Sequence, residues 1–302
     1  MTHGEQVLHD IFRSSFVGRK GLSGPGDDCA RLVPPAGARL ALSTDQLVEG
    51  VHVEAGTPPA VMARKLLRRS LSDLAAAGAT PWAVAWNVAV PAETPLRWLK
   101  KLARAFVAEA ELFGCSVIGG DLTQAAATVL SCTVIGRECS HRAPGRGGAR
   151  PGEWLVVTGR LGDAVRSRRH LLPEPRLIEG RVLVERYFAT AMIDLSDGLA
   201  ADLPRLLAAS GVGARVQLDA LPLARRLEHD LDGWRSALGE GEDYELLASL
   251  RPAHARRALE DPVLRRAGLH VIGDVVAGQD LVWEVDGQPI DPGATGWSYR
   301  WS

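Results

Sequence analysis

The stretch ATAMIDLSDGLAADL, residues 189–203, joins two patterns across a short polar turn. An apolar, strand-like run ends at Asp194, and apolar residues at helical spacing begin after Gly198. A strand that passes directly into a helix is typical of chains that fold as layers of helices and strands. The stretch therefore predicts an α/β fold, and its turn places carboxylates, on Asp194 and Asp197, at the end of a strand.

The same alternation extends over most of the chain, which predicts α/β (α+β) architecture throughout. Strands are predicted over residues 38–45, 82–90, 115–121, 128–136, 153–159, 189–195, 214–219, 244–250 and 269–276. Helices are predicted over residues 60–77, 95–113, 177–187 and 198–210. The stretch SHRAPGRGGARPGE, residues 140–153, interrupts the pattern with Gly, Pro and Arg. It predicts a boundary between a domain of residues 1–140 and a domain of residues 141–302.

Composition narrows the class of protein. The chain has 302 residues, 46% of them hydrophobic, which is enough for two cores. Its 35 basic and 36 acidic residues give a net charge of −1, which argues against a general nucleic-acid-binding surface. No apolar stretch reaches the length of a membrane span, and the first residues are polar, so we expect a cytoplasmic protein. Its four cysteines are scattered and predict buried free thiols.

Acidic residues recur at the ends of apolar runs. Asp45 closes ALSTD and Asp121 closes VIGGD, as Asp194 closes MID. Further acids in comparable settings are Asp27, Asp28, Asp73, Asp197, Glu242 and Asp243. Any one of them fits ordinary turn or capping chemistry, but so many strand-end carboxylates need a reason to converge. Mg²⁺ supplies one, because it takes carboxylate oxygens, bridges phosphates and relieves the repulsion between the acids.

Phosphate binding is the natural companion of such a site. The chain has neither a GxxxxGK[ST] nor a GxGxxG motif. Gly119 and Gly120 precede Asp121, however, and glycine lets backbone amides approach a phosphate closely. Arg146 offers a planar fork for phosphate, although a solvated loop arginine is an equal alternative.

Other polar and aromatic candidates have structural alternatives. His52 follows STD by a short turn and is as readily a structural histidine as a ligand. Trp297 offers a ring for stacking, against a core or edge role. The cations Arg64, Lys65, Arg68 and Arg69 are expected to form a solvated helix face.

Seven motifs together resemble the thiamine-monophosphate kinases. They are GDDCA (26–30), STDQLVEGVH (43–52), SLSDLAAAGATP (70–81), IGGDLT (118–123), VTGRLGDA (157–164), IDLSDGL (193–199) and GEDYELL (241–247). They stand in the family's order, and the resemblance covers residues 24–301.

The resemblance implies a fold, a reaction and partners. The fold is the two-domain one of the aminoimidazole-ribonucleotide-synthetase-like ATP enzymes. Its N-terminal domain binds ATP and magnesium and forms an intersubunit β-barrel in a homodimer, and its C-terminal α/β domain closes over the site. The reaction is the Mg²⁺-dependent, direct transfer of a phosphoryl group from ATP to thiamine monophosphate, which gives thiamine diphosphate.

Residue roles carried over from the family follow its motifs. The matched metal positions, for several Mg²⁺ ions, are Asp27, Ser43, Thr44, Asp45, Asp73, Asp121, Asp194 and Asp197. The matched ATP positions are Gly120, Asp121, Arg146 and Ser196, and those around thiamine monophosphate are His52, Glu242 and Trp297. We expect catalysis to depend on Asp45, Asp121 and Arg146, and we rank Asp28 and Asp243 below their neighbours for direct contact.

The sequence departs from the family pattern in places, and two other functions stay open. Ser70 and Ala77 replace the usual Asn and Met, a helix before Pro173 is shortened, and the ending GWSYRW is atypical. These changes affect the substrate side more than the metal cluster. One alternative is an ATP enzyme of the same fold that activates an amide or a selenide. The other is a nucleotide- or metal-binding protein without activity.

Overall fold

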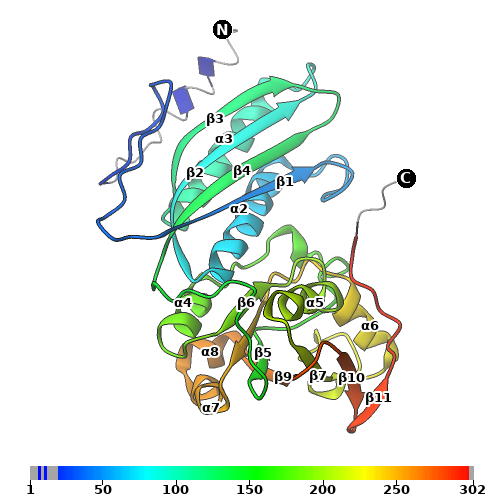
Figure 1. The fold of residues 1–302 in the computed structure, drawn as a ribbon. Helices are drawn as coiled ribbons and strands as arrows, with labels where there is room; N and C mark the ends of the chain where they lie inside the picture. Colours follow the sequence, from blue (N-terminus) through cyan, green and yellow to red (C-terminus); the bar gives the residue numbers. More distant parts are fainter. Residues whose placement is uncertain (1–5, 8–9, 12–19, 299–302) are drawn as a thin grey trace. The chain divides into compact units, whose positions relative to one another are not determined.

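The computed structural model describes residues 6–7, 10–11 and 20–298 of the chain. They form two compact units. One extends to Leu74 and resumes over Thr80–Glu138, and the other comprises Ala75–Ala79 and Cys139–Ser302. Figure 1 shows the elements of each unit along the chain.

The N-terminal unit is a four-stranded sheet with two helices. Its elements are β1 (Leu40–Val48), α2 (Pro59–Ala76), β2 (Ala79–Val90), α3 (Leu96–Leu112), β3 (Ser116–Gln124) and β4 (Val129–Glu138). The strand order is β1-β4-β2-β3, with β1 antiparallel to β4 and β2 parallel to β3. Figure 1 shows α2 and α3 on the same side of the sheet. In the core the rings of Trp86 on β2 and Phe106 on α3 stack at 4.1 Å, because the apolar faces of sheet and helices meet there.

The other face of this sheet is open in the part of the chain that the structure describes. Along β1 exposed residues alternate with more buried ones, as expected for a strand with one covered face. Leu40 and Leu42, on the uncovered face, are 40% and 64% exposed. The four strands do not close into a barrel within one chain.

The C-terminal unit is a seven-stranded mixed sheet of order β11-β10-β7-β9-β5-β8-β6. Its strands are β5 (Trp154–Val157), β6 (Ala191–Asp194), β7 (Gly213–Gln217), β8 (Leu246–Leu250), β9 (His270–Val276), β10 (Leu281–Val285) and β11 (Gln288–Ile290). Its helices are α4 (Leu177–Glu185), α5 (Leu199–Ser210), α6 (Leu231–Gly239), α7 (Pro252–Glu260) and α8 (Pro262–Ala267), with short 3₁₀ turns at Arg169–Leu171 and Leu218–Ala220.

Both faces of this sheet are covered, which is why its central strands are apolar without alternation. On one face Leu155, Ile193 and Leu247 pack with residues of α5 and α6. On the other face Val156 and Met192 pack with residues of α4, α7 and α8. The sheet thus carries two cores, and its strand-to-helix turns lie at its rim.

Every strand and helix predicted above has a counterpart, with ends shifted by a few residues. Helices α6, α7 and α8 and strands β10 and β11 were not predicted. The four cysteines are free, but the expectation that they are buried is wrong for Cys29, which is exposed, and for Cys139, which is half-buried. Among the described residues, none of the helices has the length and apolar character needed to cross a membrane.

Candidate active site

The polar group on β1 faces helix α2. The Ser43 hydroxyl donates a hydrogen bond to the Asp73 carboxylate of α2. Asp45, two residues further on the same face, lies 3.5 Å from the Arg69 guanidinium, measured from Oδ1 to Nη2. Thr44 points to the opposite face, where its hydroxyl lies 2.9 Å from that of Thr133. The structure therefore brings Ser43, Asp45 and Asp73 together, whereas the Thr44 side chain lies apart from them.

The cations of α2 differ from the expected solvated face. Lys65 is fully buried, and its ammonium donates to the His52 carbonyl oxygen at 2.7 Å. Arg68 pairs with Glu109 of α3, and Arg69 with Asp45. Only Arg64 has a largely exposed side chain. The prediction is wrong for the other three because this part of α2 lies against neighbouring elements, which supply carbonyl or carboxylate partners.

His52 is held in one orientation by its backbone neighbours. The Val48 amide N–H donates to His52 Nδ1 at 3.0 Å. Because Nδ1 accepts this bond, the neutral ring carries its proton on Nε2. The ring is thereby fixed as the tautomer with its N–H on Nε2.

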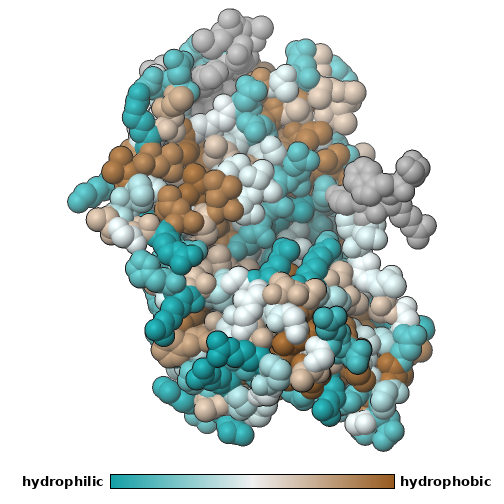
Figure 2. Space-filling model, in the orientation of Figure 1, coloured by the Kyte–Doolittle hydropathy of each residue, from teal (hydrophilic) through white to brown (hydrophobic). Residues whose placement is uncertain are grey.

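The turn GPGDD, residues 24–28, lies at a cavity of about 330 Å³ in the N-terminal unit. Its walls include Trp86 on β2, Leu99 on α3 and Ile118 on β3, and Asp28 and Asp121 also line it. Figure 2 shows apolar side chains on this face of the unit, where the blue N-terminal loop of Figure 1 runs beside the sheet. The cavity thus combines apolar walls with carboxylates.

Asp27 and the two glycines before Asp121 have identifiable local roles. Asp27 accepts hydrogen bonds from Arg31 and from the Asp28 amide, and these two contacts lower the pKa of Asp27. A Cβ at Gly120 would lie 1.9 Å from the Trp86 carbonyl oxygen, so the packing of β3 against β2 itself requires glycine. At Gly119 a Cβ would meet only open space.

In the C-terminal unit a buried aspartate, which the sequence did not reveal as part of the site, shapes the strand-to-helix turn. Asp202 on α5 accepts the amide N–H groups of Ser196 and Asp197, at 3.0 and 2.9 Å. Its side chain is 1% exposed, and burial raises the pKa of Asp202. Arg205 bonds both Asp202 and the carboxylate of Asp197, at 2.5 and 2.6 Å. Asp202 is the fourth residue of α5, one position beyond the acid of a capping box, so the usual helix-start spacing does not reveal it.

Two distant parts of the chain form backbone hydrogen bonds with the turn of residues 193–199. The Ser196 carbonyl oxygen accepts the Glu242 amide N–H at 2.8 Å, and the Asp197 carbonyl oxygen accepts the Trp297 amide N–H at 2.8 Å. The Trp297 ring is 43% exposed. Four predicted site residues of this unit, Ser196, Asp197, Glu242 and Trp297, therefore lie at one turn, together with Asp194, which is buried at the end of β6.

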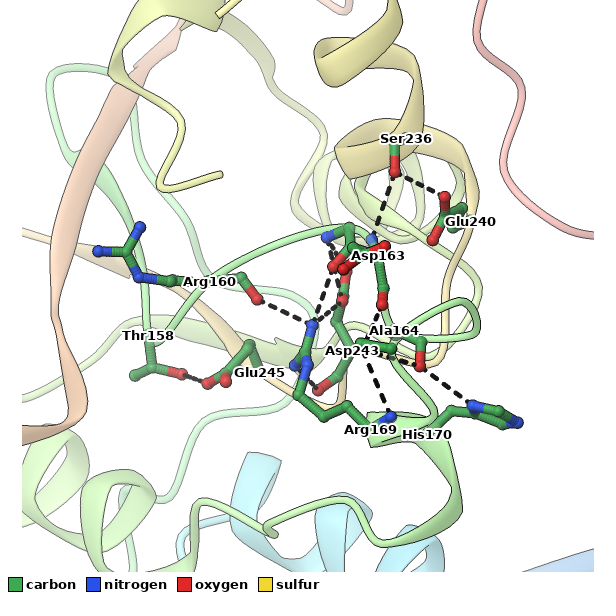
Figure 3. A network of polar contacts seen from close by, with 12 residues as sticks. Thr158, Arg160, Asp163, Ala164, Arg169, His170, Ser236, Glu240, Asp243 and Glu245 are labelled. Atoms are coloured by element: carbon green, nitrogen blue, oxygen red, sulfur yellow. Dashed lines mark hydrogen bonds and ion pairs between the residues drawn. The ribbon is translucent and has the colours of Figure 1, made fainter. Parts of the chain in front are cut away.

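The neighbours of Glu242 form the polar network in Figure 3. Both carboxylate oxygens of Asp243 accept the Gly162 amide, and Oδ1 also accepts Arg169 Nη2 at 2.7 Å. Burial raises the pKa of Asp243 to about 7. Glu245 bonds Thr158 at 2.7 Å in the same region. Asp243 thus holds the loop in place, and its lower rank for direct contact with a ligand stays a prediction.

Backbone strain marks the same loop. Glu242 and Tyr244 have φ of 60° and 54°, a region that residues with side chains rarely adopt. Gly241 has φ of 70°, and a Cβ there would lie 2.7 Å from the Ser196 carbonyl oxygen. Such strain persists only where neighbouring contacts hold it, and here Asp243 supplies them.

Arg146 lies on the boundary loop of the C-terminal unit. Its side chain is exposed and makes no hydrogen bond or ion pair within the described residues, while its carbonyl oxygen accepts the Ser210 hydroxyl at 3.2 Å. An arginine fixed at its backbone and free at its guanidinium is available to an anionic ligand.

The carboxylates belong to different units. Asp27, Asp45, Asp73 and Asp121 lie in the N-terminal unit, and Asp194 and Asp197 in the C-terminal unit. Within the described residues, no group of three or more His, Cys, Asp or Glu side chains is close enough to hold a metal ion. The donors are nonetheless hard oxygens of the type that Mg²⁺ takes, and Ser43, Asp45 and Asp73 already share one face. The residues fit such an ion, and their convergence on it stays a prediction.

Family models and curated relatives agree on the family of proteins that this chain resembles. Residues 26–137 match the model of the AIR synthase related protein N-terminal domain, and residues 150–286 match that of its C-terminal domain. The chain is 37% identical over 294 residues to the thiamine-monophosphate kinase of Salmonella typhimurium, covering 89% of each chain.

Two solved structures extend the similarity to three dimensions. The thiamine-monophosphate kinase of Stenotrophomonas maltophilia K279a matches with a TM-score of 0.82 and 32% identity, over 93% of this chain and 96% of that one. The structure described as AaThiL complexed with AMPPCP and TMP matches with a TM-score of 0.74 and 26% identity, over 97% and 94%.

Proposed function

We propose, from the premise that the chain belongs to the thiamine-monophosphate kinase family, that it phosphorylates thiamine monophosphate with ATP. The products are thiamine diphosphate and ADP. The observation that carries this function is the 37% identity to a curated kinase over 89% of both chains. A solved relative that covers nearly the whole chain and holds AMPPCP and TMP supports it.

The cavity of the N-terminal unit suits the base of the nucleotide. Its apolar walls, which include Trp86 and Ile118, favour a planar ring, and Asp28 and Asp121 lie at the same cavity. In this assignment Gly120, Asp121, Arg146 and Ser196 contact ATP.

Magnesium is proposed as the resident cation of the site. The side chains that would hold it are those of Asp27, Ser43, Asp45, Asp73, Asp121, Asp194 and Asp197. Thr44, whose side chain points to the opposite face, would contribute only through its backbone. When bound, Mg²⁺ supplies charge neutralisation and orientation of the phosphates. In the chain itself the Ser43–Asp73 hydrogen bond and the Asp45–Arg69 pair orient the donors and offset part of their repulsion.

The acceptor makes a general base unnecessary. A phosphate monoester has a second pKa of about 6, so thiamine monophosphate is largely a dianion at neutral pH. The chain must instead position two anions and balance their charge, a task for Arg146 and the N–H of His52. Glu242 and the exposed ring of Trp297 suit the cationic thiazolium and its neighbouring ring.

The roles of the two domains and the homodimer are likewise proposals. Residues 1–140 would bind ATP and Mg²⁺ and form a dimer, and residues 141–302 would close over the site. The open face of the four-stranded sheet supports an intersubunit β-barrel, because Leu40 and Leu42 expose apolar surface along an edge strand.

The function is tested by assaying purified protein with Mg²⁺ and ATP, offering thiamine monophosphate or unphosphorylated thiamine. We expect ADP release and thiamine diphosphate, identified by chromatography, only with the monophosphate. ATP binding without product from either acceptor would contradict the proposal and favour a protein that binds nucleotide without catalysis.

A further inference from the structure

A second cavity, of about 490 Å³, lies wholly in the C-terminal unit. Its walls come from the loop of residues 142–150, the end of α4 and the first turn of α7. The lining residues are Arg142, Gly148, Arg150, Val184, Phe188, Ala189, Thr190, Arg251 and His254. None of them has a role in the kinase reaction proposed above, so the kinase site does not account for this cavity.

Its charge is of one sign. Arg142, Arg150 and Arg251 are exposed, and within the described part of the chain their guanidinium groups make no ion pair and no hydrogen bond. None of the described residues that line the cavity carries a carboxylate. Elsewhere in this unit Arg169 and Arg176 each bind a buried acid. Guanidinium groups that surround a cavity without neighbouring acids are suited to an anion, and each can donate two parallel hydrogen bonds to phosphate oxygens.

The wall that carries Arg150 is fixed in place. The Ser210 hydroxyl accepts the amide N–H groups of Gly148 and Ala149, at 3.1 and 3.2 Å. Gly148 has φ of 131°, and a Cβ there would lie 2.4 Å from the Thr190 carbonyl oxygen. Thr190 is held in turn by Glu153, at 2.6 Å. The loop therefore packs closely against the strand side of the cavity and gives its arginines a stable base.

An aromatic pair completes the lining. The Phe188 ring lies 5.5 Å from the His254 ring at an angle of 48°, and 55% of Phe188 is exposed. Phe188 has φ of 55°, unusual for a bulky residue, and His254 Nδ1 lies 3.0 Å from the Tyr187 carbonyl oxygen. The exposed ring thus stands beside an anchored imidazole, and a planar group could stack on it.

We propose that this cavity binds a small phosphorylated molecule that carries a planar ring. Its phosphate oxygens take the forks of Arg142, Arg150 and Arg251, and its ring packs on Phe188 and His254. The volume lies in the range of small-molecule sites, roughly 300–1,000 Å³. Nucleotides and phosphorylated ring cofactors share this chemistry.

The test is calorimetric titration of the full chain in metal-free buffer with EDTA, where the uncompensated acids of the proposed kinase site repel phosphates. The probes are AMP, thiamine diphosphate and inorganic pyrophosphate. We expect AMP or thiamine diphosphate to bind at one molecule per chain, and the tighter of the two identifies the source. The double variant R150Q/R251Q should weaken binding about tenfold or more, because two charge-assisted contacts are lost. R266Q, which removes an exposed arginine outside the cavity, should leave it unchanged.

The variant Phe188→Leu tests the contribution of the ligand's planar ring independently of that of its phosphate. It should weaken the ring-bearing probe several-fold and leave pyrophosphate unaffected. The proposal is overturned if no probe binds, or if R150Q/R251Q binds as the unaltered chain does. If all three probes bind equally and Phe188→Leu changes none of them, the proposal that the cavity recognises a planar ring is overturned. Thermal melting and kinase assays confirm that each variant is folded. If R150Q/R251Q does not fold, the single variant R251Q takes its place. Because binding is measured without turnover, failure of the proposed kinase function would leave this result standing.

Discussion

The backbone N–H of Trp297 donates a hydrogen bond to the carbonyl oxygen of Asp197, with an N···O distance of 2.8 Å. One residue earlier in the same turn, the Ser196 carbonyl oxygen accepts a hydrogen bond from the Glu242 amide N–H. A turn assigned to metal and ATP therefore holds, through main-chain bonds, the two residues assigned to thiamine monophosphate. Because these bonds involve only the backbone, the side chains of Glu242 and Trp297 can be changed while their positions are kept.

Replacement of Trp297 by alanine should raise the KM for thiamine monophosphate about tenfold, since an aromatic face over a cationic ring contributes roughly 1–2 kcal/mol. The KM for ATP should stay close to normal. W297F, which keeps a ring, should retain most of the affinity. The measurement is steady-state kinetics with each substrate varied in turn, and an unchanged KM for thiamine monophosphate in W297A would remove Trp297 from the substrate site.

Asp202 gives a prediction about stability. D202A leaves the amides of Ser196 and Asp197 without their acceptor and removes one of the two partners of Arg205, so it should lower the free energy of unfolding by about 2–4 kcal/mol. D202N keeps one acceptor oxygen and should recover part of that loss. Urea unfolding followed by circular dichroism gives both values. Equal stability of D202A and the unaltered chain would show that the turn does not depend on Asp202.

The alternation of strands and helices could be predicted because each element carries its own local pattern. The hairpin of β10 and β11 also had a local signal, the pair Asp286–Gly287, whose φ values of 50° and 72° are those a tight turn requires. Helices α7 and α8 begin at Pro252 and Pro262, which are start signals of the same kind. These elements were missed although local chemistry specifies them.

The remainder of the site could not be predicted, because it depends on contacts between distant residues. The charge of Lys65 looks like that of a solvated helix residue until the fold places the His52 carbonyl beside it. Nor does local sequence show that Gly120 is required by Trp86, or that Asp243 binds Arg169. The carboxylates were visible as a group, but their division between two units became apparent only in the structure.

The carboxylates of Asp45 and Asp121 give a prediction about turnover. Each replacement by asparagine should lower kcat at saturating Mg²⁺ by about 10²–10³-fold, the cost of losing a charge that stabilises phosphoryl transfer. The fold should be retained, as judged by an unchanged melting temperature. D232N is the matched control, because Asp232 lies far out in solvent with a side chain 93% exposed. Near-normal turnover in D45N and D121N would contradict the assignment of these residues to the metal.

Asp243 gives a prediction about pH. Its pKa is raised by burial to about 7, above the value of 3.8 expected in the unfolded chain. Between these two values the folded chain binds more protons at this site than the unfolded chain, so this site makes stability fall as pH rises from about 4 to about 7. D243N, which cannot ionise, should show a flatter dependence over that window. Its overall stability should be lower, because Arg169 loses its charged partner. Urea unfolding at several pH values measures both effects, and parallel curves for the two proteins would show that Asp243 does not titrate in this range.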